Sequence, residues 1–150
     1  MKEVRTEIEI SAPPEEVWKV ISNISEWQNW SPVINKSEGS AALGTKVDIT
    51  MCSKEEGKDG PKYSPVITKF DEPKSLHWRA TMLVGFVFTN DKIIELEKTN
   101  SGTRVIHKEL FGGLMAAMMA SHMEEGVPPI LNKWNEALKQ KVENESKASA

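Results

Sequence analysis

The C-terminal part of the chain constrains the fold most, because it combines a helical repeat with a single apolar face. From residue 127 onward, apolar side chains recur at intervals of four and three residues on an otherwise polar segment: Val127, Leu131, Trp134, Leu138 and Val142. This spacing predicts a long amphipathic helix whose apolar stripe must be covered by other parts of the chain. Pro128 and Pro129 mark either the true start of this helix or a kink in it. Residues 146–150 are expected to fray.

A series of strands precedes this helix. In residues 4–10, side chains at even positions are apolar or Thr and those at odd positions are charged, which predicts a strand with one buried face. Further strands are predicted over residues 46–51, 63–70, 76–82, 85–97 and 103–111. A turn-rich run over residues 56–61 is expected to join a hairpin, and Pro65 to lie at an edge or a bulge. Because no helix interrupts this series, the sheet is expected to be antiparallel.

Two short helices are predicted between the first strand and the rest of the sheet. The sequence from Ser11 to Glu16 has prolines and then glutamates, both of which favour a first helical turn. A second short helix is expected to carry Trp27 and Trp30 and to end at the Ser31–Pro32 pair.

The order of these elements predicts an α+β fold in one domain that spans residues 1–150. A curved antiparallel sheet of about seven strands would wrap around the long C-terminal helix. A single helix is ~10 Å across with its side chains, which is too narrow to fill so wide a concave face. The remaining space is therefore the expected binding site.

Charge and composition exclude several classes of function. The formal net charge of the 150 residues is −3, and no basic run is present, so nucleic acid is not an expected partner. No apolar run approaches the ~20 residues that span a bilayer, so no integral membrane association is expected. The N-terminus lacks the apolar stretch of a signal peptide, and the one cysteine, Cys52, has no internal disulfide partner. A cytoplasmic location is therefore expected.

Several blocks together give the chain a family resemblance. They are Ile10–Trp18, Ile24–Trp27, Trp30–Pro32, Leu76–Trp78, Gly102–Glu109, Phe111–Gly113 and Trp134–Lys139. On these residues the chain resembles the SRPBCC superfamily, the START-like or polyketide cyclase/dehydrase-like group, over nearly its whole length. The resemblance implies the helix-grip fold and a hydrophobic pocket. It does not select a function, because members include lipid carriers, hormone receptors and cyclases.

The predicted pocket combines residues of the sheet with residues of the long helix. The sheet would contribute Trp78, Val105, His107 and Phe111, and the helix Val127, Leu131, Trp134 and Leu138. Asp48, Thr50 and Tyr63 are candidates for further polar groups. Trp18, Trp27 and Trp30 are expected to anchor the short helices and one edge of the pocket mouth. Met115, Met118, Met119 and Met123 form a cluster that is either core filler or an adaptable pocket wall, for which Met115 and Met119 are the candidates.

His107 and Glu109 are the candidate catalytic residues. They lie two positions apart on a predicted strand and therefore point to the same face. An imidazole beside a carboxylate can act as a general base with its orienting partner. Both residues are equally compatible with a structural polar network. His122, Glu124 and Glu125 lie too loosely spaced to predict a metal site with them, and no cofactor is expected.

Three functions are compatible with the sequence. The first is binding, transport or sequestration of a hydrophobic small molecule such as a lipid, a polyketide or an aromatic compound. The second is a cyclase- or dehydratase-like enzyme that uses His107 and Glu109. The third is a protein-interaction or co-chaperone-like module, which predicts a large exposed apolar patch. The oligomeric state is left open.

Overall fold

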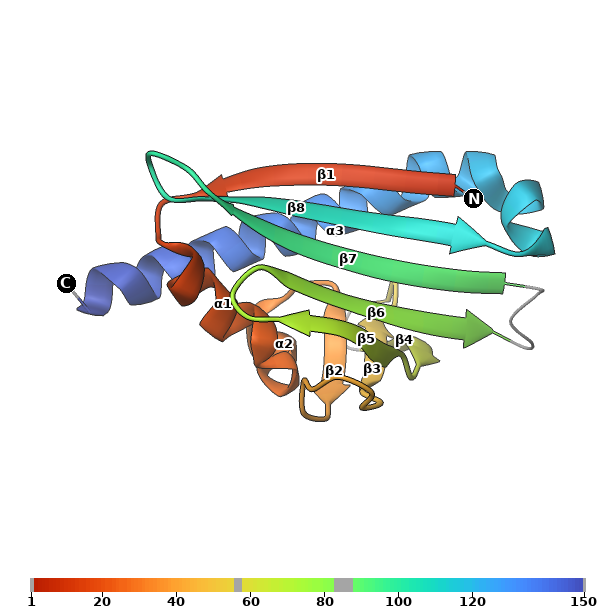
Figure 1. The fold of residues 1–150 in the computed structure, drawn as a ribbon. Helices are drawn as coiled ribbons and strands as arrows, with labels where there is room; N and C mark the ends of the chain where they lie inside the picture. The colour runs from red at the N-terminus through yellow and green to blue at the C-terminus, as the bar shows by residue number, and fades with distance from the viewer. Residues whose placement is uncertain (1, 56–57, 83–87, 150) are drawn as a thin grey trace.

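The structure is a computed structural model that describes residues 2–55, 58–82 and 88–149 (Figure 1). Its elements, in chain order, are β1 (Lys2–Ile10), α1 (Pro14–Ser22), the 3-10 turn η1 (Ile24–Glu26), α2 (Trp27–Trp30), β2 (Ile34–Glu38), β3 (Asp48–Cys52), β4 (Asp59–Tyr63), β5 (Val66–Asp71), β6 (Ser75–Met82), β7 (Phe88–Lys98), β8 (Thr103–Gly112) and α3 (Leu114–Ser149).

The larger of two sheets has five antiparallel strands in the order β1-β8-β7-β6-β5. It curves, and α3 crosses one side of it (Figure 1). The pairing register brings chemically distinct side chains together in rows. Lys92 lies opposite both Trp78 and Glu109, and His107 lies opposite both Thr6 and Ile94. Because side chains directly opposite one another on neighbouring strands point to the same face, each row forms a band across the concave side of the sheet.

The smaller sheet has three strands in the order β2-β3-β4. The segment just before β3 bonds to β5: the Ile67 amide donates to the Thr45 carbonyl at 2.9 Å, and the Val47 amide donates to the Pro65 carbonyl at 3.0 Å. The two sheets thus continue one another around the core.

The helix-grip fold is confirmed, with corrections to the strands. The described residues contain eight strands rather than about seven. The strand expected over residues 63–70 is divided between β4 and β5 at Ser64–Pro65, because proline has no N–H to continue a ladder. The run over residues 56–61 was expected to join a hairpin, and the strands on either side, β3 and β4, do pair antiparallel. However, β4 already begins within the run at Asp59, and residues 56 and 57 lie outside the described residues. The β2 strand was missed because most of its side chains are polar.

The short helices close one end of the sheet. The buried face of α1 carries Val17, Trp18 and Ile21. The Trp27 indole N–H donates to the carbonyl of Ile21 at 3.1 Å, which fixes α2 against α1. Trp27 is fully buried and lies at the centre of the main apolar core.

Helix α3 is continuous from Leu114 to Ser149, with Pro128 and Pro129 inside it, so the Met-rich segment is helix and not linker. Its stripe is buried as predicted from Leu131 to Val142. The second half is tied to the sheet end, where Glu143 accepts a hydrogen bond from the Ser11 amide at 2.9 Å. The fraying expected over residues 146–150 stays a prediction.

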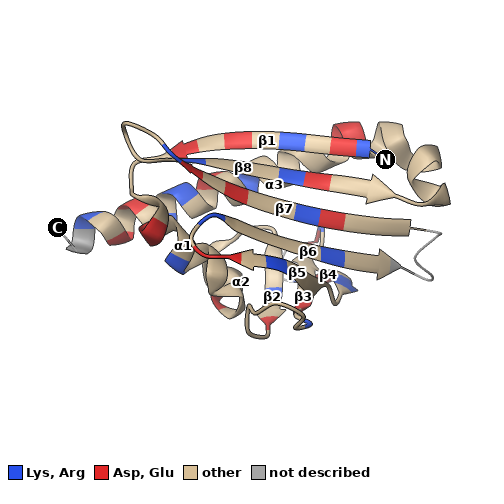
Figure 2. Cartoon of the chain, in the orientation of Figure 1, with Lys and Arg blue, Asp and Glu red and all other residues tan. Residues whose placement is uncertain are grey.

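The apolar core has two parts. The larger part surrounds α1, α2 and the second half of α3. The smaller part lies under the first half of α3 and consists of Val4, Phe111, Ala116, Met123 and Leu131. On the strands of the larger sheet, acidic and basic residues are interspersed rather than gathered by sign (Figure 2). Pairs such as Arg104–Glu9 are about half exposed, and exposed pairs of this kind contribute little to stability.

Two glycine substitutions test these backbone assignments. Gly126 is an exposed residue inside α3, and an added Cβ would meet no atom within 4 Å. Gly126→Ala is therefore expected to raise the free energy of unfolding by about 0.5–1 kcal/mol, because Ala is the better helix former. Urea unfolding followed by circular dichroism measures the change. A loss of stability would contradict a continuous helix through residue 126.

Gly102→Ala is the opposite case. Gly102 has a φ of +154°, and an added Cβ would collide with the carbonyl oxygen of Ile10. Urea unfolding followed by circular dichroism is expected to show a clear loss of stability for this variant, because the β7–β8 turn must shift away from β1.

Candidate functional site

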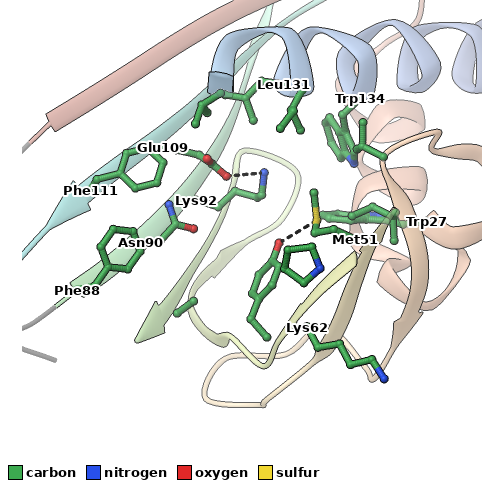
Figure 3. A pocket seen from close by; sticks show the side chains of 17 residues that line it. Trp27, Met51, Lys62, Phe88, Asn90, Lys92, Glu109, Phe111, Leu131 and Trp134 are labelled. Atoms are coloured by element: carbon green, nitrogen blue, oxygen red, sulfur yellow. Dashed lines mark hydrogen bonds and ion pairs between the residues drawn. The ribbon is translucent and has the colours of Figure 1, made fainter. Parts of the chain in front are cut away.

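A cavity of about 230 Å³ lies between α3 and the two sheets (Figure 3). Its walls are mainly aromatic and aliphatic and include Trp27, Phe88, Phe111, Val127, Leu131 and Trp134. Residues of both parts of the core contribute, so the cavity lies where the two parts meet. Its volume is below the ~300–1,000 Å³ of pockets that enclose drug-sized ligands. As it stands, it suits a small ring system or a short chain segment.

An ion pair lies in the lining of this mainly apolar space. Lys92 on β7 is opposite Glu109 on β8, and its Nζ is 3.2 Å from Glu109 Oε1. The two side chains are only 10% and 13% exposed. In Figure 3 they face each other beside the aromatic walls. Since an unpaired charge at such depth is strongly destabilising, each charge depends on its partner.

The Lys92 ammonium has further contacts besides Glu109. Its Nζ is 2.7 Å from His107 Nε2. It also lies 5.6 Å from the ring centroid of Trp78 and 5.9 Å from that of Trp134. Cation–π attraction from two indole rings compensates part of the hydration that the ammonium loses on burial.

The hydrogen bonds around His107 define its tautomer. His107 Nδ1 is 2.9 Å from Asn135 Oδ1, while the Asn135 amide N–H donates to Thr6 Oγ1 at 2.9 Å. An amide oxygen only accepts, so Nδ1 carries the proton and Nε2 accepts from Lys92. The Thr6 hydroxyl donates onward to the His107 carbonyl at 3.0 Å. The result is a buried chain of hydrogen bonds that joins β7, β8, α3 and β1.

His107 is held in the neutral form. Its side chain is fully buried, and burial lowers its pKa well below the ordinary value. The positive charge of Lys92 lowers the pKa further, whereas the hydrogen bond to Asn135 acts in the opposite direction. With both ring nitrogens engaged inside the protein, His107 presents neither of them to the cavity.

Some polar groups at the cavity have no partner of their own. Among the described residues, Asn90 Nδ2 and Trp134 Nε1 are buried donors without a protein acceptor, and both residues line the cavity. Tyr63 also lines it, and its hydroxyl reaches only Met51 Sδ, at 3.7 Å. Burial and then the charge of Glu109 raise the pKa of Tyr63, so the phenol stays neutral. Buried donors without partners are uncommon in native proteins, and a ligand oxygen would satisfy them.

The structure brings together only part of the predicted site. Of the predicted residues, the cavity is lined by Glu109, Phe111, Val127, Leu131 and Trp134. Four others lie in the packed interior but do not line it: Trp78, Val105, His107 and Leu138. Met115 and Met119 lie at the start of α3, where they are 39% and 37% exposed, and also do not line it.

The candidate catalytic pair is separated. Lys92 Nζ lies between His107 and Glu109 and contacts both. Direct proton transfer from a ligand to His107 therefore has no geometric support, although His107 still positions Lys92. The catalytic role itself remains a prediction.

Several lining residues were not predicted from the sequence, among them the polar pair Lys92 and Asn90; the others are Val33, Ile34, Met51, Pro61, Lys62, Ala80, Phe88 and Ile130. A signal for Lys92 was present, since it shares its strand face with Ile94 and Leu96 and is therefore a lysine on an apolar face. Trp27, expected near one edge of the pocket mouth, lines the cavity. Asp48 and Thr50 do not line it, whereas Tyr63 does.

Three further observations bear on the alternative functions. Leu114 and Met118 at the start of α3 are 71% and 83% exposed, so the protein has exposed apolar side chains as well as a cavity. In residues 2–55, 58–82 and 88–149, no cluster of three or more His, Cys, Asp or Glu side chains is arranged to hold a metal ion. None of the described helices has the length and apolarity needed to cross a membrane.

The low pKa of His107 gives a testable dependence of stability on pH. Its unfolded value is near 6.5 and its folded value is lower, so below pH 6.5 the unfolded chain binds a proton that the folded protein does not. We expect the free energy of unfolding to fall as the pH decreases from 7 to 5, by up to about 1.4 kcal/mol per pH unit for this residue. Urea unfolding at several pH values, before most carboxylates titrate, measures the slope.

His107→Gln should flatten this dependence. His77→Gln is the comparison variant: burial also lowers the pKa of His77, but this side chain is only partly buried, so its removal should flatten the dependence less than His107→Gln does. If the slope were unchanged in His107→Gln, His107 would not be held neutral in the fold.

Comparisons with known proteins agree with this architecture. The family model described as polyketide cyclase/dehydrase and lipid transport matches residues 1–143. Protein CV1439 from Chromobacterium violaceum has a TM-score of 0.75 at 13% identity, over 95% of this chain and 99% of that one. Protein NE0264 from Nitrosomonas europaea has a TM-score of 0.69 at 20% identity, over 93% and 96%.

A third similar structure is the di-domain ARO/CYC protein StfQ from the steffimycin biosynthetic pathway. Its TM-score is 0.76 at 7% identity, over 97% of this chain and 52% of that one. These identities show a shared fold only. The comparison with curated proteins gives no match. Because the family model covers nearly the whole chain, this protein belongs to the polyketide cyclase/dehydrase and lipid transport family of the SRPBCC superfamily.

Proposed function

We propose that this protein binds a small hydrophobic molecule in the cavity between α3 and the sheets. The observation that carries the proposal is the cavity itself, about 230 Å³ in volume, with aromatic walls and buried N–H groups that have no acceptor among the described residues. Such a combination is typical of ligand sites, where apolar walls supply affinity and a few polar groups fix the orientation. The lipid transport in the family description supports the same function.

The size of the cavity narrows the ligand. At about 230 Å³ it accommodates one aromatic ring system or one segment of an acyl chain. A longer lipid or polyketide would have to extend past Val127 and Ile130, which line the cavity from α3. Binding, transport and sequestration all begin when the ligand enters this cavity, and they differ only in how the ligand is released.

A second candidate is catalysis of the cyclase or dehydratase type, and the buried Lys92–Glu109 pair favours it. A carboxylate in an apolar cavity can remove a proton from a bound substrate, and an adjacent ammonium can stabilise the oxyanion that develops. His107 would then be a positioning residue for Lys92. Under this proposal Glu109→Gln abolishes turnover while a substrate analogue still binds, whereas a carrier has no turnover to lose.

The protein-interaction alternative stays a prediction, which the exposed side chains of Leu114 and Met118 favour.

Native mass spectrometry of the purified protein is the direct test of binding. We expect a stoichiometric adduct that solvent extraction releases as an apolar compound, or, for empty protein, a rise in Tm with added aromatic or acyl compounds. A ligand present at 100 times its Kd raises stability by about 2.7 kcal/mol. Protein that carries no adduct and gains no stability from such a panel would contradict the proposal.

A substitution that fills the cavity tests whether the ligand binds there. Ala80 on β6 is buried and lines the cavity. Ala80→Phe should place a ring in the empty space, so we expect a folded protein that has lost ligand binding. A fully packed core would instead lose ~1–3 kcal/mol of stability to overpacking. Ala42→Phe, at an exposed loop position, is the matched control and should keep both stability and binding. Retained binding in Ala80→Phe would place the ligand elsewhere.

A further inference from the structure

We infer that the buried Lys92–Glu109 pair selects the ligand by charge. The cavity takes an uncharged molecule with an apolar body and an oxygen acceptor, and it rejects anions and cations of the same shape. This inference rests on the proposed ligand binding and names the chemical class of the ligand.

An anionic ligand is disfavoured by Glu109. The carboxylate already lies 3.2 Å from the Lys92 ammonium and is 13% exposed. A ligand carboxylate at the same ammonium would bring two negative charges together at a buried site, where like charges repel strongly. The other charged residue along the cavity wall is Lys62, whose side chain is 69% exposed and lies near Asp59, so it does not compensate for a second anion.

A cationic ligand is disfavoured by Lys92. The cavity is rich in aromatic rings, which commonly hold an ammonium group. Lys92 already occupies that position, because its Nζ lies within 6 Å of the centroids of both Trp78 and Trp134. Glu109, which could neutralise a ligand cation, is already paired with Lys92.

A neutral oxygen fits the groups that remain. The Lys92 ammonium has three hydrogens, and its polar contacts with His107 and Glu109 account for two of them. Asn90 Nδ2 and Trp134 Nε1 are buried at the same cavity without an acceptor. A carbonyl or ether oxygen accepts from such donors and adds no charge to the site.

Four probes on one scaffold separate these cases: 2-acetylnaphthalene is neutral with an acceptor, 2-ethylnaphthalene is neutral without one, 2-naphthoate is an anion, and 2-naphthylmethylammonium is a cation. Titration calorimetry at pH 7.5 should give the tightest Kd for the ketone. Both ions are expected to bind about tenfold or more weakly than the ketone, a ratio that corresponds to ~1.4 kcal/mol.

Two single substitutions should change the selectivity in opposite directions. Glu109→Gln frees the ammonium, so 2-naphthoate should gain about tenfold or more in affinity over its value in the unmodified protein. Lys92→Met frees the carboxylate, so 2-naphthylmethylammonium should gain instead. Lys19→Met is the matched control, because Lys19 belongs to an exposed Lys–Glu pair on α1 and does not line the cavity, and it should leave both preferences unchanged.

The double variant Lys92→Met with Glu109→Gln contains no buried charge of the pair, so it should fold even if the single variants do not. In it neither ion should show the gain in affinity that the single variants show, because neither charge of the pair remains, while Asn90 and Trp134 can still donate to the ketone. A gain for 2-naphthoate or 2-naphthylmethylammonium that persists in the double variant overturns the inference, as does binding of all four probes to the unmodified protein with similar Kd. These two results leave the proposed ligand binding intact. Failure of all four probes to bind overturns the proposed function itself.

Discussion

The burial of one ammonium group organises the interior of this protein. Lys92 projects from the middle of the sheet into an apolar core, and its charge must be compensated there. Glu109, His107 and two indole rings provide the compensation. Because His107 can accept from Lys92 only in one tautomer, the compensation depends in turn on Asn135. A single charge thereby links three strands of the sheet to the C-terminal helix.

The same arrangement explains why a cavity exists at this place. Trp27 and Trp134 pack with ring centroids 5.1 Å apart and fill the space under the second half of α3. Toward the first half, the core is a separate and smaller cluster around Phe111 and Leu131. The ion pair lies on the strands between the two, where close apolar packing is interrupted by polar groups. The open space lies at this packing discontinuity, and two donors without a partner among the described residues, Asn90 Nδ2 and Trp134 Nε1, belong to residues that line it.

Family membership and chemistry are separate conclusions for this chain. The fold is shared with proteins that are 7–20% identical to it, and a fold preserved at such divergence carries many functions. The chemistry depends on the cavity, which Lys92 and Glu109 line as an ion pair while neutral His107 holds Lys92 from the interior. By our inference, this set determines which charges the cavity tolerates.

The sequence by itself determined the architecture. The alternation in residues 4–10, the strands that follow and the apolar stripe from Val127 to Val142 each depend on neighbours along the chain, so periodicity reveals them. Alternation put Glu109 and Phe111 on one face of their strand, but both faces are partly apolar, and the family resemblance was needed to favour that face as the concave one. Periodicity did not reveal β2, whose polar side chains form a strand only because β3 pairs with it.

The tertiary structure alone decided the site. Lys92 meets Glu109, His107 and Trp78 through strand register and through the packing of α3, at separations along the chain that no local pattern encodes. Likewise, only packing decided that Trp78 and Leu138 are core while Leu131 and Trp134 reach the cavity, because all four lie on apolar faces. A residue's face follows from local geometry, whereas its partners follow from how distant elements are brought together.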